Sequence, residues 1–126
     1  MSKTAITSKE LSPPVGPFSQ AVKIDGFIYF SGQVGQDPTT GKLVTGGIGA
    51  ETERVFQNLS AVLKAAGKGF DDVVRAGAYL TNMSDYAALN GIYAKHFSQP
   101  FPARTVIGVA ALPLGACVEI DLVVRA

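Results

Sequence analysis

Three side chains on predicted strands have the chemistry of a binding or catalytic site. Arg104 follows Pro102 closely, and Glu119 and Asp121 alternate with apolar residues over 117–124. A rigidly held guanidinium presents a planar fork that matches a carboxylate or a phosphate, and a carboxylate can position or activate a water molecule. The residue types therefore indicate either an anion-binding site with a general base, or an ordinary salt bridge between Arg104 and one acid.

The other reactive side chains are few. His96 is the single histidine, and no serine has a partner histidine with which a catalytic triad could be proposed. Cys117 is the single cysteine and lies in an apolar run, which is typical of a small structural thiol and excludes an internal disulfide or a cysteine zinc site. The sequence contains no Walker loop, dinucleotide fingerprint or histidine-rich metal set.

The elements that position these side chains alternate between strands and helices. Two β-prone runs, 20–24 and 27–31, flank an Asp-Gly pair, which is a strong hairpin signal. Apolar residues recur every three or four positions over 49–66 and predict a helix with two glutamates in its first turn and Gly67 as its end. Ser84 predicts the N-cap of a second helix. The remaining predicted strands are 72–80, 104–111 and 117–124.

We expect the two final strands to form a hairpin on an α+β sheet that carries both helices on one face. Every second residue from Val118 to Val124 is apolar and should lie beneath the helices. Glu119, Asp121 and Arg104 then belong to the other face. If the hairpin loop centres near Leu114, Glu119 pairs opposite Val109, about 17 Å along the strand from Arg104, so a salt bridge within one chain would be difficult.

Composition limits the class of protein. The chain has 126 residues, of which 47% are hydrophobic and only 17% charged, consistent with one ordered domain spanning 1–126. A formal net charge of +1 lacks the basic field of a general nucleic-acid binder. No secretory signal or membrane span is evident, and we expect a cytoplasmic protein. So much apolar surface predicts a subunit interface, on the sheet face to which we assign Val106, Gly108, Ala110 and Val123.

Several short motifs, in order along essentially the whole chain, resemble the Rid family, also called the YjgF family and often labelled endoribonuclease L-PSP. The pairing of Pro-Ala-Arg with Val-Glu-Ile is specific to that family. The matching motifs are Gly16-Pro17-Phe18-Ser19-Gln20-Ala21, Phe30-Ser31-Gly32-Gln33, Asn90-Gly91-Ile92-Tyr93 with Phe97, Pro102-Ala103-Arg104-Thr105 and Val118-Glu119-Ile120.

The resemblance implies a chorismate-mutase-like α+β subunit that forms a homotrimer with its sheets facing inward and a ligand cleft between neighbouring subunits. It implies hydrolysis of 2-imino or enamine acids, released by pyridoxal-phosphate enzymes, to 2-oxo acids and ammonia. Arg104 would hold the substrate carboxylate and Glu119 would position or activate the water. The cleft would also be lined by Phe18, Ser31, Gly32, Asn90, Thr105 and Val106.

An imine is already electrophilic, so orientation and modest general-base help are sufficient, and we expect no metal and no organic cofactor. Val106 stands where the deaminase subgroup commonly has cysteine, and Phe18 replaces its common tyrosine. Both departures weaken the expectation of efficient deamination more than that of ligand binding. The alternatives are a metabolite-binding or chaperone-like trimer without turnover and, less favoured, a ribonuclease or translation inhibitor.

Overall fold

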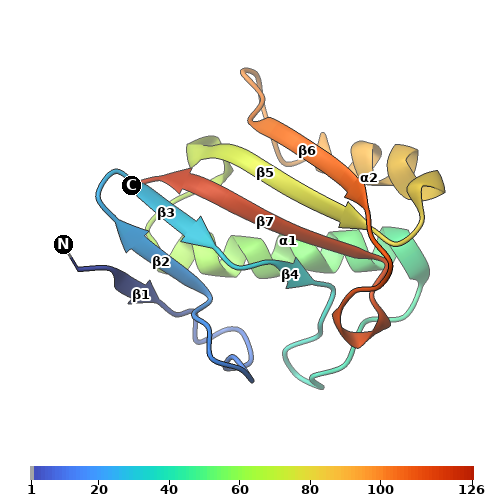
Figure 1. The fold of residues 1–126 in the computed structure, drawn as a ribbon, viewed down its shortest axis with the longest axis horizontal. Coiled ribbons are helices and arrows are strands. Elements are labelled where there is room, and N and C mark those ends of the chain that lie inside the picture. Colours follow the sequence, from blue (N-terminus) through green and yellow to red (C-terminus); the bar gives the residue numbers. More distant parts are fainter. Residues whose placement is uncertain (1) are drawn as a thin grey trace.

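In the computed structural model, which describes residues 2–126, seven strands form one mixed sheet and two α-helices lie against the same face of it (Figure 1). This arrangement confirms the predicted α+β class. Within residues 2–126, no helix is both long and apolar enough to cross a membrane. The elements are β1 (Thr4–Ile6), β2 (Ala21–Ile24), β3 (Phe27–Phe30), β4 (Gln33–Val34), α1 (Gly47–Ala65), β5 (Val73–Leu80), α2 (Tyr86–Tyr93), β6 (Ala103–Gly108) and β7 (Val118–Arg125), with short 3₁₀ turns at Phe70–Asp72, Met83–Asp85 and Pro113–Gly115.

The predicted N-terminal hairpin is confirmed. β2 and β3 pair antiparallel, with Ala21 opposite Phe30. The turn between them is tight because Asp25 adopts a left-handed φ of 51°, a conformation that aspartate tolerates better than most residues. β1 adds a strand on the outer edge of this hairpin.

The predicted hairpin between the two final strands is wrong, because β5 lies between β6 and β7. β5 pairs parallel with β6 and antiparallel with β7. Parallel neighbours need a crossover connection, and α2 supplies it between β5 and β6. The short connection after β6 contains the 3₁₀ turn at Pro113–Gly115 and carries the chain past β5, so that β7 enters the sheet between β5 and β3.

α1 ends where the sequence predicts and begins slightly earlier. Gly67 has a φ of 71°, and its neighbour Lys68 donates its backbone N–H to the Leu63 carbonyl at 2.9 Å, which completes a Schellman-type end. Because the helix begins at Gly47, the expectation of glutamates in its first turn is wrong. Glu51 instead lies buried, and its carboxylate accepts the backbone N–H of Cys117 at 2.9 Å.

The start of α2 also differs from the prediction. A 3₁₀ turn over Met83–Asp85 precedes the helix, and the side chain of Asn82 caps that turn by accepting the Ser84 N–H at 3.0 Å. Ser84 is therefore inside the capped turn, and its hydroxyl donates to the same Asn82 oxygen. The α2 residue Leu89 is fully buried against the core.

The core fills the space between the sheet and the two helices. Val118, Ile120, Leu122 and Val124 of β7 are at most 2% exposed, as the alternating pattern predicts. At the α2 end an aromatic cluster joins the helices: His96 stacks on Phe56 with centroids 4.2 Å apart. Burial lowers the pKa of His96.

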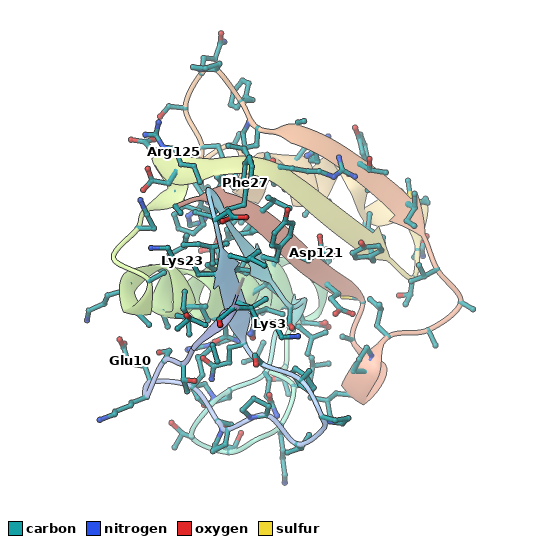
Figure 2. The ribbon with its side chains drawn as sticks, turned by 60° about the vertical axis from the view of Figure 1, so that its left-hand side comes forward. Lys3, Glu10, Lys23, Phe27, Asp121 and Arg125 are labelled. Atoms are coloured by element: carbon teal, nitrogen blue, oxygen red, sulfur yellow. The ribbon has the colours of Figure 1, made fainter. Side chains whose placement is uncertain are left out.

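The opposite face of the sheet carries no helix and keeps apolar groups in the open (Figure 2). Phe27, Tyr29 and Ile107 are 44%, 47% and 45% exposed. The assignment of Val106 and Gly108 to this face is wrong. Val106 packs against the helix-side core, and a Cβ on Gly108 would point at Met83, which precedes α2, at 3.2 Å.

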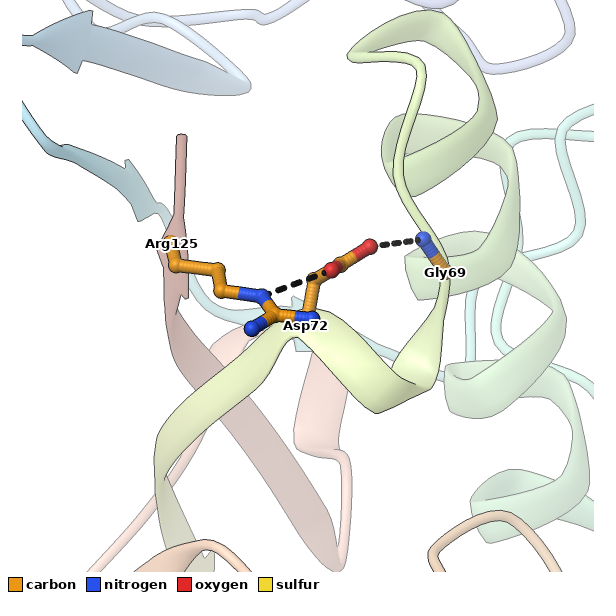
Figure 3. A network of polar contacts seen from close by, with 3 residues as sticks. All are labelled: Gly69, Asp72 and Arg125. Atoms are coloured by element: carbon orange, nitrogen blue, oxygen red, sulfur yellow. Dashed lines mark hydrogen bonds and ion pairs between the residues drawn. The ribbon is translucent and has the colours of Figure 1, made fainter.

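A small polar network ties the end of β7 to the connection between α1 and β5 (Figure 3). The Asp72 carboxylate accepts the Gly69 N–H at 3.0 Å and the Arg125 Nε–H at 2.9 Å. These two hydrogen bonds, the backbone one first, hold the pKa of Asp72 below its usual value. The network holds the C-terminal end of β7 beside the start of β5.

Candidate active site

The residues predicted to form the site lie on two separate surfaces of the chain. A cleft of about 500 Å³ contains Phe18, Ser31, Gly32 and Glu119. A second hollow, of about 320 Å³, lies between α2 and β6 and contains Asn90 and Arg104. Within residues 2–126, no three histidine, cysteine or acidic side chains are grouped so that they could hold a metal ion.

Glu119 stands on β7 and forms one wall of the larger cleft. It pairs with Val34 of β4 on one side and with Tyr79 of β5 on the other. Its carboxylate lies directly against Gly32, where an added Cβ would collide with it and lie 2.8 Å from its Cδ. Only glycine leaves room for the acid in this position.

The electrostatic environment of Glu119 favours its protonated form. Burial raises the pKa of Glu119, and the negative charge of Asp121 raises it further. Asp121 lies two residues along β7 on the same face, where its carboxylate accepts the Tyr79 hydroxyl at 2.9 Å. Neither acid takes part in the two ion pairs found among residues 2–126. Glu119 is therefore suited to accept and return a proton.

The rest of the cleft combines a rigid apolar rim with a few polar groups. Phe18 is 53% exposed at its mouth. The Ser31 hydroxyl donates to the Ser19 carbonyl at 2.7 Å, so its oxygen can meet a ligand only as an acceptor. Besides Phe18, the apolar part of the wall consists of Leu11, Pro13, Pro14, Val15, Val34, Pro38, Pro113 and Leu114.

Arg104 lies on the helix-covered side of the sheet, so its predicted placement beside the acids is wrong. In the parallel pairing of β5 and β6 it stands opposite Ala76, which is fully buried beneath the helices. Its guanidinium donates through Nη2 to the Tyr86 hydroxyl at 3.1 Å, and its Cζ lies 4.6 Å from the centroid of the Tyr93 ring. An internal salt bridge to Glu119 or Asp121 is not formed.

The neighbours of Arg104 divide between the two faces. Thr105 points to the open face, where its hydroxyl accepts from Arg75 at 3.0 Å, and Val106 points to the helix side. β6 is an edge strand of the sheet. One row of its backbone N–H and C=O groups, beside Arg104, therefore has no neighbouring strand to pair with. Asn90 borders the same hollow from α2.

Comparison with known proteins identifies the family. Residues 8–126 match the family described as Endoribonuclease L-PSP. The chain belongs to this family. A 2-iminobutanoate/2-iminopropanoate deaminase of Dermatophagoides farinae is 42% identical over 125 residues, covering 98% of each chain, and a human protein of the same description is 41% identical, covering 96% of this chain and 88% of its own. The crystal structure of RidA from Psychrobacter superposes with a TM-score of 0.92 at 41% identity, covering 98% and 99% of the two chains.

The family's two common descriptions, deaminase and endoribonuclease, both occur among the relatives. A solved structure from Thermotoga maritima, described as a putative endoribonuclease, has a TM-score of 0.93 at 36% identity and covers 98% of this chain. The L-PSP family fold is therefore shared by proteins described in both ways, and the choice between the activities depends on the site residues.

Sequence reasoning missed the tyrosines that surround the charged groups. Tyr86 and Tyr93 contact Arg104, and Tyr79 contacts Asp121. The spacing of Tyr86 and Tyr93 in the helix places both on one side, and that signal indicates an apolar face as readily as an aromatic support for a cation. Tyr79 could be placed only once β5 was known to be the neighbour of β7.

The close approach of Gly32 to Glu119 gives a test of the cleft geometry. We expect Gly32→Ala to lower the free energy of unfolding by about 1–3 kcal/mol, because the carboxylate must move out of its slot. Urea unfolding would measure the change, with Gly26→Ala as the matched control, since a Cβ there has nothing within 4 Å. In a Glu119→Ala background the cost should largely disappear, and an unchanged cost would contradict the proposed contact.

The raised pKa of Glu119 gives a second test. Its pKa in the folded chain lies above its usual value of 4.5, so the contribution of Glu119 to stability is fully present below that value and is lost as the pH rises through the folded pKa. We therefore expect Glu119→Gln to be more stable than the natural chain at pH 7. The advantage should vanish below pH 4.5. Urea unfolding at several pH values would measure it, and an equal difference in the free energy of unfolding at pH 4 and pH 7 would contradict the prediction.

Proposed function

We propose that this chain hydrolyses small 2-imino acids, such as 2-iminobutanoate and 2-iminopropanoate, to 2-oxo acids and ammonia. The observation that carries the proposal is a pair of ionisable groups, each without an oppositely charged partner within residues 2–126. Arg104 is a cation whose partners within residues 2–126 are only tyrosines, and Glu119 is a half-buried acid with a raised pKa. The deaminase description of relatives at 41–43% identity over nearly the whole chain supports the assignment.

The residues divide the reaction between binding and proton transfer. Arg104 holds the substrate carboxylate through paired N–H donors. Glu119 takes a proton from water while the water oxygen bonds to the imine carbon, and it returns that proton to the imino nitrogen. The new hydroxyl then loses its proton to the same nitrogen, the C–N bond breaks, and ammonia leaves the 2-oxo acid. Orientation supplies much of the rate because the imine is already electrophilic.

The remaining predicted residues shape the two halves of the cleft. Ser31 and the backbone beside Gly32 border the path of the attacking water, and Phe18 forms the aromatic wall. Asn90 and the free backbone of β6 around Thr105 and Val106 border the carboxylate end. Because Gly32 has no side chain, the Glu119 carboxylate can lie against it, on the side of the cleft assigned to the attacking water.

A complete site requires a second copy of the chain. Arg104 and Glu119 lie on opposite faces of one sheet, and a three- or four-carbon substrate cannot reach both within one subunit. We propose the homotrimer of the family resemblance, with the open sheet faces inward and the Glu119 cleft of one copy against the α2–β6 surface of the next. The exposed Phe27, Tyr29 and Ile107 support burial of that face. The proposal includes a cytoplasmic location, because a short-lived imine must be met where it is released.

A metabolite-binding trimer without turnover is the second candidate. It is favoured by Val106 and Phe18, which offer neither a thiol nor a hydroxyl to the imino nitrogen or its water. The carboxylate anchor is unaffected by either residue. Ribonuclease activity is less favoured because a net charge of +1 supplies no basic track for RNA.

The deaminase proposal is tested with 2-iminobutanoate generated in place by an amino-acid dehydratase and followed by trapping with semicarbazide. We expect the chain to accelerate imine decay, and Arg104→Ala to lose roughly 100-fold of that acceleration, as for a charged bidentate contact worth about 3 kcal/mol. Lys64→Ala is the matched control, because it also removes a cation, in this case from the exposed ion pair between Lys64 of α1 and Glu10. Binding of 2-oxobutanoate in calorimetry without any acceleration would instead support the metabolite-binding candidate.

The shared site is tested by mixing two inactive variants. Arg104→Ala and Glu119→Ala chains are unfolded together and refolded as mixed oligomers. Activity should return to about one quarter of the natural level, because each shared site needs one intact Arg104 and one intact Glu119 from different copies. Mixed oligomers that stay inactive, or a chain whose native mass is that of one subunit, would rule out the shared cleft.

A further inference from the structure

Two tyrosines of α2 surround the functional end of Arg104. The Tyr86 hydroxyl accepts from Nη2 at 3.1 Å, and the Tyr93 ring lies below the guanidinium with its centroid 4.6 Å from Cζ. The Tyr86 ring is also near, at 5.7 Å. We infer that Tyr86 and Tyr93 are positioning residues that fix the direction of the Arg104 guanidinium while leaving its charge free for a ligand. The inference rests on the proposed role of Arg104 as the carboxylate anchor.

Tyrosine partners can orient the Arg104 guanidinium without neutralising its positive charge. A carboxylate partner would fix Arg104 but would also compete with an anionic ligand. A tyrosine hydroxyl occupies one of the five guanidinium N–H donors, and an aromatic face attracts the cation without occupying any of them. The other donors of Arg104 therefore remain available, and the full positive charge remains uncompensated.

The two tyrosines differ in how firmly they are held. Tyr93 is 6% exposed and packs against Phe97, with centroids 4.5 Å apart, and against Phe56 at 6.0 Å. Its ring is therefore part of the core and gives Arg104 a fixed platform. Tyr86, seven residues and about two helical turns earlier, is 41% exposed and reaches the guanidinium with its hydroxyl.

The arrangement has a binding advantage. A free arginine side chain loses rotamer entropy when it is immobilised, and an arginine that is already oriented has lost much of that entropy during folding. Loss of either tyrosine should thus weaken anion binding through Arg104 rather than change the proton transfer at Glu119. In kinetic terms KM should rise more than kcat falls.

The direct test follows the Arg104 Nε–Hε group by NMR, assigned from the signal that Arg104→Lys removes. We expect restricted motion and a ring-current shift in the natural chain. Tyr93→Leu should remove the shift, and Tyr86→Phe should increase the motion. Unchanged spectra in both variants would overturn the inference, and this readout needs neither a ligand nor an active enzyme.

The functional test measures binding of 2-oxobutanoate by calorimetry, together with the kinetics of imine decay. Tyr86→Phe and Tyr93→Leu should each weaken binding about three- to tenfold, and Tyr93→Phe, which restores the ring, should recover most of the loss. Thermal unfolding of each variant shows whether the fold is retained. Because Tyr93→Phe restores core packing as well as the ring, the change at the exposed Tyr86 decides between positioning and packing, and unchanged binding in Tyr86→Phe would overturn the inference.

A double-mutant comparison separates positioning from general packing. In an Arg104→Lys background, where the planar fork is absent, Tyr86→Phe should have little further effect on binding, and an effect as large as in the natural chain would overturn the inference. If the natural chain neither binds 2-oxobutanoate nor hydrolyses the imine, the proposed function fails. The NMR measurement then still decides whether the two tyrosines orient Arg104.

Discussion

β7 pairs with β5 along one edge and with β3 and β4 along the other, and this double pairing determines where the acids of the site lie. Because side chains alternate along a strand, the same eight residues supply the floor of the core on one face and Glu119 and Asp121 on the other. A shift of one residue would exchange the two sets. Burial of Val118, Ile120, Leu122 and Val124 therefore fixes the position of the acids as firmly as it fixes the core.

The open face carries an energetic cost that the helix-covered face offsets. Glu119 and Asp121 lie close together, and their mutual repulsion and partial burial oppose the charged state of Glu119. Tyr79 reduces the cost for Asp121 by donating a hydrogen bond. Groups held in this way are typical of functional sites, where stability is lost in return for reactivity. The packed core beneath β7 allows the fold to tolerate them.

Local signals in the sequence were sufficient for the parts of the fold that depend on neighbours in the chain. The Asp-Gly hairpin, the amphipathic α1 and its end at Gly67 all follow from spacing and turn chemistry. The predicted site residues belong to short, contiguous motifs, and the structure places them in two hollows. The placement of Arg104 could not be predicted, because it depends on which strand lies beside β6, and pairing between distant segments leaves no mark in local periodicity. The two final segments look like a hairpin until α2 is seen to carry the chain from β5 to β6. The start of α1 was misplaced for a similar reason, since Glu51 is held by Cys117, which lies far along the chain.

The choice of arginine at position 104 has a consequence for the fate of the product. A 2-oxo acid condenses readily with a neutral primary amine to form a Schiff base, and a lysine holding the same carboxylate would be exposed to that reaction. In the proposed site a guanidinium, which stays protonated, would bind the carboxylate without becoming a nucleophile. Burial, with help from Glu51, also raises the pKa of Cys117 to about 12, so its thiol stays protonated near neutral pH. In the proposed reaction the chain would thus release a carbonyl compound repeatedly without being covalently modified by it at either residue.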